Sequence, residues 1–157
     1  MRLKGLTFLL IICSSFYTHA HNEVVGQIHF ENYQNTLSIK AILNKKHLTL
    51  ALEKEGNCSL KDMLKVCGEK YFNKSICITV NNDSISLKST DYQLEKEAVI
   101  FTYQIKLPSS EINSIGVNSN YMLSYNDHGI VKASFLINDI TSSYNLSSTR
   151  KQIIAHF

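Results

Sequence analysis

The stretch EAVIFTYQIKL, residues 97–107, decides the fold. Val99, Phe101 and Tyr103 fall at every second position, so their side chains share one face of an extended strand, and mostly polar residues alternate with them. Pro108 follows directly after the stretch. Because proline cannot donate a backbone hydrogen bond to a strand ladder, the strand ends before it. The pattern predicts a strand buried on one side, with Phe101 in the core.

The same alternation recurs in short segments on both sides of this stretch, separated by turn-forming residues. A helical period replaces it only after the second segment, over residues 45–55 and again from a capping-box-like start at Ser59 and Asp62. We therefore expect a mainly β protein, an immunoglobulin-like two-layer β-sandwich with a two-helix insertion at about residues 45–72. The segments expected to be strands are 24–33, 36–43, 76–80, 85–94, 97–107, 112–117, 121–125, 130–137, 140–146 and 153–157.

Residues 1–20 have the three parts of an export signal. Arg2 and Lys4 supply the positive start, the apolar run LTFLLIIC follows, and Thr-His-Ala ends at Ala20. Cleavage after Ala20 gives a mature chain that begins at His21, and we expect residues 21–157 to form a single domain. A retained N-terminal anchor or a buried first strand is the alternative. No later apolar run approaches the length of a membrane span, so no transmembrane segment is expected after cleavage.

Composition and charge narrow the class of protein. Hydrophobic residues make up 44% and charged residues 18% of the chain, which excludes a disordered protein. Removal of the leader takes two of the 16 basic residues and none of the 13 acidic ones, so the mature chain is close to neutral. That balance argues against a nucleic-acid partner.

Three cysteines remain after the leader: Cys58, Cys67 and Cys77. An odd number allows at most one disulfide within the chain, and either Cys58 with Cys67 or Cys67 with Cys77 fits an oxidising compartment. Their spacings match no structural zinc pattern. We also expect a buried free thiol among them.

Five features of the layout stand out together: the leader, the mature start at histidine, the two helices after the second strand, the QLEKEAVIFTYQ hairpin and the end GIVKASFLINDITSSYNLSSTRKQ. In these features the chain resembles a family of small exported Bacteroidota proteins that is described only as a domain of unknown function. The chain departs from the family pattern at its start, where His21-Asn22 replaces His-Pro. The resemblance implies an exported bacterial protein with no assigned activity and no catalytic residues to transfer.

The sequence contains no glycine-rich phosphate loop, no nucleophile-elbow serine and no paired-histidine helix motif. Cys67 with His47 is the one imaginable nucleophile and base, but Cys67 lies on an apolar helical stripe and is expected to pack in the core. We therefore expect no enzyme activity and no cofactor. The expected function is a non-enzymatic binding or accessory module of the bacterial envelope, periplasmic or surface-associated, whose partner is an envelope protein or a small ligand.

His21 carries the alternative hypothesis, a periplasmic copper-binding protein. A mature N-terminal histidine offers an α-amine and an imidazole that together chelate copper(II). His29, on the polar face of the first strand, or His128, in a turn, supplies a third ligand in this hypothesis. The competing interpretation is a frayed terminus and a surface histidine.

Overall fold

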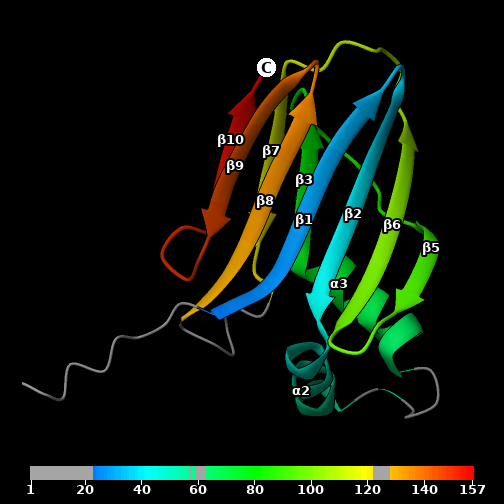
Figure 1. Ribbon diagram of the computed structural model, residues 1–157, viewed down its shortest axis with the longest axis vertical. Helices are drawn as coiled ribbons and strands as arrows, with labels where there is room; N and C mark the ends of the chain where they lie inside the picture. The colour runs from blue at the N-terminus through cyan, green and yellow to red at the C-terminus, as the bar shows by residue number, and fades with distance from the viewer. Residues whose placement is uncertain (1–22, 57, 59–62, 122–127) are drawn as a thin grey trace, which may run out of the picture.

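The computed structural model describes residues 23–56, 58, 63–121 and 128–157 (Figure 1). The predicted leader, His21 and the Ser59 start of the second helix lie outside these ranges. Within them, no helix is long and apolar enough to cross a membrane. The elements in chain order are β1 (Glu23–Tyr33), β2 (Thr36–Asn44), α2 (Lys45–Glu55), a π-helical turn η2 (Met63–Cys67), α3 (Gly68–Ser75), β3 (Ile76–Val80), β4 (Asp83–Ser84), β5 (Ser89–Leu94), β6 (Ala98–Lys106), β7 (Ser114–Ser119), β8 (Gly129–Ile137), β9 (Ile140–Leu146) and β10 (Gln152–His156).

The strands form two sheets packed as layers. The larger sheet has the order β5-β6-β2-β1-β8-β9, and the smaller has the order β10-β7-β3-β4. Neighbouring strands run antiparallel except β1 and β8, which pair in parallel. The small sheet lies behind part of the large one, and the helices lie toward the lower end of the sandwich (Figure 1). The predictions of a mainly β two-layer sandwich and of two helices after the second strand are confirmed.

β6 is the strand that the sequence singled out. Phe101 and Tyr103 are fully buried, and Phe101 lies between Ala41 of β2 and Tyr92 of β5 in the ladder. The strand ends where Leu107 donates its backbone N–H to the Asn35 carbonyl over 2.8 Å, just before the proline. The inward placement of Phe101 is confirmed.

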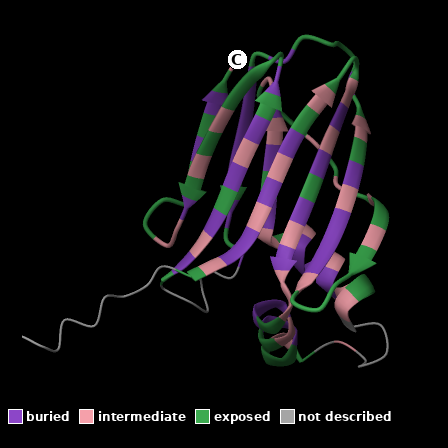
Figure 2. Ribbon diagram, in the orientation of Figure 1, coloured by how far each residue is buried: buried purple, intermediate pink, exposed green. Residues whose placement is uncertain are grey.

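Along β1, β2 and β8 of the large sheet, buried residues alternate with intermediate or exposed ones (Figure 2). The inner row of this sheet packs on the small sheet and on the helices. Phe30 stacks on Phe135 with ring centroids 4.7 Å apart, and Phe72 of α3 lies 6.2 Å from Tyr103 of β6. Helical side chains thus cover part of the large sheet that the smaller sheet does not reach.

The helical insertion is defined by its caps. The Asn44 side chain accepts the His47 backbone N–H over 3.2 Å at the start of α2, and Gly56 ends the helix with a φ of 69°. Glycine adopts this left-handed conformation without a side-chain clash, which fits the predicted stop at that position. The second helix begins as the π turn and extends to Ser75, three residues beyond the predicted end.

The prediction of one strand over 85–94 is wrong. β4 pairs with β3 in the small sheet, β5 pairs with β6 in the large sheet, and residues 85–88 cross between the two layers. Ile85 and Leu87 are partly buried against the core in this crossing segment. Ile85 donates its backbone N–H to the Ile78 carbonyl of β3 over 3.0 Å. Two apolar residues of the crossing segment, two positions apart, thus mimic the alternation of a single strand.

β1 differs from its predicted pattern by a bulge between Val24 and Gly26. The bulge lets Val25 enter the core, where it is fully buried. One extra residue in a strand shifts which side chains face inward, and a strict two-residue period cannot show it.

Candidate functional site

His29 lies on the outer face of the large sheet. Its Nδ1 is hydrogen-bonded to the Ser134 hydroxyl of β8, and Lys40 of β2 is its neighbour on the other side. Partial burial and the charge of Lys40 lower the pKa of His29 and favour the neutral ring. Neither cross-strand neighbour of His29 is a carboxylate.

The lower end of the sandwich brings Glu23, His47 and His128 together. The Glu23 backbone N–H donates to the His128 carbonyl over 3.1 Å. The Glu23 Oε1 atom lies 2.8 Å from Nε2 of His47, which makes an ion pair when the ring is protonated, although the direction of the contact does not suit a hydrogen bond. A local sequence pattern could not predict the contact between Glu23 and His47, because 24 residues separate them and only the fold brings β1 and α2 together.

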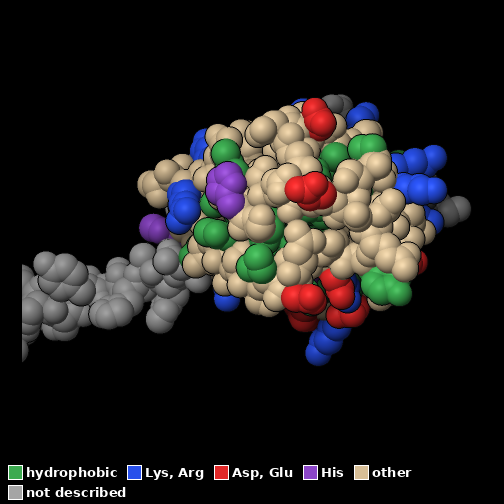
Figure 3. Space-filling view, turned by 90° about the horizontal axis from the view of Figure 1, so that it is seen from above, with side chains coloured by type: hydrophobic (Ala, Val, Ile, Leu, Met, Phe, Trp, Pro, Cys, Tyr) green, Lys and Arg blue, Asp and Glu red, His purple; other side chains and the backbone are tan. Residues whose placement is uncertain are grey.

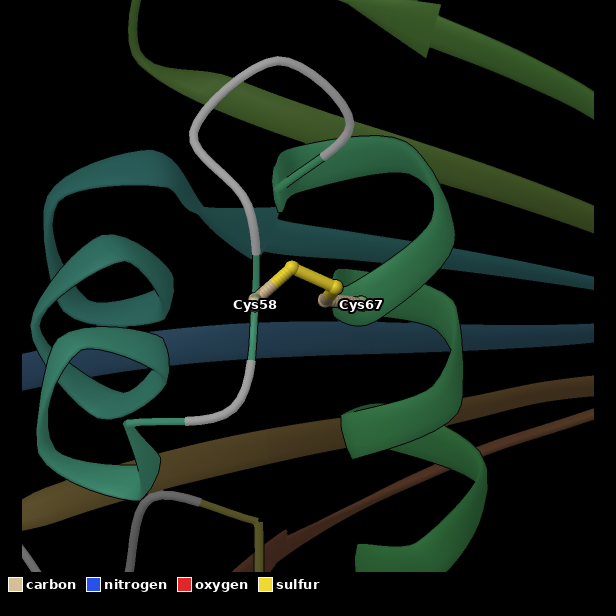
Figure 4. Close-up of a disulfide and its surroundings, with 2 residues drawn as sticks. All are labelled: Cys58 and Cys67. Atoms are coloured by element: carbon tan, nitrogen blue, oxygen red, sulfur yellow. A yellow bond between two sulfur atoms is a disulfide. The ribbon is translucent and has the colours of Figure 1, made fainter.

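Cys58 and Cys67 form a disulfide, with Cα atoms 6.2 Å apart (Figure 4). The bond joins the segment after α2 to the π turn. It occupies the Cys67 sulfur and excludes the imagined pair of Cys67 with His47. Cys77 is a free thiol and is exposed on β3, so the expectation of a buried free thiol is wrong. Cys77 faces outward because its strand neighbours Ile76 and Ile78 take the inward positions.

A shallow pocket of about 260 Å³ lies beside this disulfide. Leu52, Val66 and Tyr71 give it apolar walls, and Lys70 and Lys74 contribute basic side chains. The ammonium group of Lys74 lies 3.7 Å from a carboxylate oxygen of Glu55.

A second pocket, of about 240 Å³, lies at the upper end between the β3–β4 turn and the end of β6. Val80 and Leu107, both buried, contribute to its apolar floor together with Ile85 and Ile105, which are partly exposed. Asp83, Ser84, Lys106, Ser109 and Glu111 surround the floor with polar side chains. Seen from this end, hydrophobic side chains lie between acidic and basic ones (Figure 3). We call the pocket of about 240 Å³ the upper pocket.

Asn81 fixes the wall of the upper pocket. Its side-chain oxygen accepts the backbone N–H groups of Asn113 and Ser114 over 2.8 and 3.1 Å, and its amide donates to the Glu111 carbonyl over 2.9 Å. Asn81 and Asn82 both have positive φ values, as the turn requires. The sequence predicted this turn and the end of β6 separately, but a local pattern could not show that they border one pocket.

Among the described residues, no three histidine, cysteine, aspartate or glutamate side chains are grouped to hold a metal ion. His21 lies outside those residues. No family model and no curated protein matches the chain. Both pockets combine apolar and charged side chains. We take the upper pocket as the candidate site because the three hydrogen bonds of Asn81 hold its wall in place.

Proposed function

We propose that the protein is an exported, non-enzymatic binding or accessory module of the bacterial envelope, and that it recognises a short segment of a partner protein at the upper pocket. The observation that carries this proposal is the apolar floor of Val80, Ile85 and Leu107 inside a rim that bears Lys106 and Glu111. An apolar floor with a few polar groups at its edge is the usual composition of a binding pocket.

The size of the pocket favours a peptide over a metabolite. Pockets for drug-sized ligands span about 300–1,000 Å³, and this one has about 240 Å³. That volume suits one or two apolar side chains. The remaining contacts would come from the surrounding surface, where Asp83, Lys106 and Glu111 offer both signs of charge.

Export is supported by the leader pattern and by the disulfide between Cys58 and Cys67. The bacterial envelope is supported by the family resemblance. We also propose that the sandwich is immunoglobulin-like. Its two face-packed sheets support this assignment. Fractionation of the native host and mass measurement of the purified chain test the location. Loss of residues 1–20 is expected, and a cytoplasmic chain with an intact leader would contradict it.

Selection from a random displayed peptide library tests the pocket. Selected peptides should combine an apolar residue with a charged flank, and their affinity should fall at least about tenfold for Lys106→Glu. Lys132→Glu is the matched control, because Lys132 is also an exposed lysine of the large sheet but lies in the middle of β8, away from the lining of the upper pocket. Equal binding to both variants, or no selected peptide at all, would overturn the proposal.

Copper binding at a processed N-terminus is the second candidate function. The observation that favours it is the hydrogen bond from Glu23 to His128, because His21 is two residues from Glu23 and can lie no more than about 7 Å from it. His29 lies six residues further along β1, about 20 Å from Glu23. The form of the hypothesis that we retain therefore uses His128 as the third ligand.

Titration of the processed protein with copper(II) tests this candidate. One equivalent should produce a d–d absorption band and raise the melting temperature, and His128→Ala should weaken both effects. His156→Ala, at the end of β10, is the control. The absence of a band and of a melting shift with the unmodified chain would end this hypothesis.

A further inference from the structure

β9 is one edge of the large sheet, and half of its backbone groups face away from β8. The β8–β9 hairpin has a two-residue turn, Asn138-Asp139, in which both residues have positive φ values. This turn type makes the flanking pair, Ile137 and Ile140, the first hydrogen-bonded pair of the ladder. Bonding then alternates, so the N–H and C=O groups of the odd-numbered residues of β9 point outward. Those residues are Thr141, Ser143 and Asn145.

The three outward-facing residues are accessible. All are exposed. Within the described part of the chain, none of them takes part in a backbone hydrogen bond outside the ladders. The edge thus presents three donors and three acceptors in a row to solvent.

This edge also lacks the features that usually prevent strands from pairing between molecules. β9 runs for seven residues without a charged residue, a proline or a register shift. The opposite side of the sandwich differs. There, β5 carries Asp91 and a bulge next to it, and β4 has only two residues.

We propose that a second copy of this chain pairs with β9 in antiparallel register, about a two-fold axis at Ser143. Ser143 then faces the partner's Ser143, and Thr141 faces the partner's Asn145. In this register all three donors and all three acceptors of each copy are satisfied. Two six-stranded sheets become one continuous sheet.

The chemistry of β9 favours a second copy as the occupant. A two-fold interface places each residue against the same surface of its partner, so a charge near the axis would meet itself. The side chains at the three hydrogen-bonded positions, Thr141, Ser143 and Asn145, are small, polar and neutral. At the positions between them, Ser142 comes to lie opposite the partner's Tyr144, and Ile140, which is 46% exposed, opposite the partner's Leu146, whose side chain is buried in its own chain.

The mass of the chain in solution tests the proposal. Sedimentation between about 1 and 100 μM should show a concentration-dependent dimer. At the higher concentration, the amides of Thr141, Ser143 and Asn145 should exchange more slowly with solvent. A monomer throughout this range would overturn the proposal.

Substitutions at Ser143 locate the interface. Ser143→Pro removes an outward N–H and leaves the ladder to β8 intact, and Ser143→Lys places two like charges at the axis. Each should raise the dimer dissociation constant at least about tenfold, whereas Gln104→Lys, on the exposed outer face of β6, should leave it unchanged. An equal mixture of Ser143→Lys and Ser143→Asp chains should recover the dimer. Circular dichroism checks that each variant is folded.

β10 is the competing edge, since it lies on the same side of the sandwich (Figure 1). Lys151 accepts the backbone N–H of Ser119 at the end of β7, and Phe157 donates its own to the carbonyl of Asn113 just before β7. Bonding alternates between these two points, so the backbone groups of Ile154 face outward. Ile154→Pro should therefore leave the dimer unchanged. A dimer that is lost with Ile154→Pro, or one that persists in Ser143→Pro and Ser143→Lys, would refute pairing through β9.

Discussion

Replacement of Phe101 by aspartate should unfold the protein. Phe101 has no exposed surface, lies beside Ala41 in the ladder and has its ring centroid 5.5 Å from that of Tyr92. Truncation of a buried phenylalanine alone costs about 3–5 kcal/mol. A buried carboxylate without a partner costs several kcal/mol more. A small domain is stable by about 5–15 kcal/mol, so the two losses together reach that range.

Thr102→Asp is the matched control, because it places the same side chain one residue further on the opposite face of β6. Thr102 lies between Lys40 of β2 and Asp91 of β5, one charge of each sign. Its effect on the free energy of unfolding should therefore stay within about 1 kcal/mol. Urea and thermal unfolding, followed by circular dichroism, measure both variants. A soluble Phe101→Asp protein with a cooperative transition would show that the packing argument for this strand is wrong.

Three further predictions concern stability. Reduction of the disulfide between Cys58 and Cys67 should lower the free energy of unfolding by about 2–3 kcal/mol, the loop-entropy value for a closure of this length. Urea unfolding midpoints with and without reductant test this, and an unchanged midpoint would contradict it. Gly56→Ala should cost about 1 kcal/mol, because alanine strains at a φ of 69° while its Cβ meets no neighbour; a melting temperature equal to that of the parent would contradict this. The pKa of His29 is lowered in the folded chain by burial and by Lys40, so the unfolded chain binds the proton first as the pH falls below about 6.5, and stability is lost there. His29→Gln should reduce that acid sensitivity in melts between about pH 5 and 7, and an identical pH profile would refute the assignment.

Most strands could be predicted from the sequence because their core faces follow local alternation. The segment 140–146 shows this well, since the turn residues Asn138 and Asp139 precede it and the observed strand has the same bounds. The prediction of one strand over 85–94 failed because Ile85 and Leu87 pack against the core from the segment that crosses between the two sheets. Alternation shows that a residue is buried, but it does not show which sheet the residue joins.

The candidate site was less accessible to sequence reasoning. The sequence allowed two disulfide pairings of the three cysteines. The fold selects Cys58 with Cys67, because Cys77 faces outward from β3 and stays a free thiol. The upper pocket forms only because the β3–β4 turn of the small sheet lies next to the end of β6 in the large sheet. His29 was correctly placed on the polar face, but its contact with Ser134 depends on the parallel pairing of β1 with a strand that begins at Gly129.

The parallel pairing of β1 with β8 also affects the order of folding. β1 lies between β2, its neighbour in the chain, and β8, which is about 100 residues away. When the N-terminal part of the chain appears first, the β1–β2 hairpin can form early. The other edge of β1 stays unpaired until residues 129–137, which form β8, are also available. Contacts at this sequence separation slow folding. The large sheet is therefore expected to close late. Under the proposed export of an unfolded chain, the core would stay incomplete until residues 129–137 had crossed the membrane.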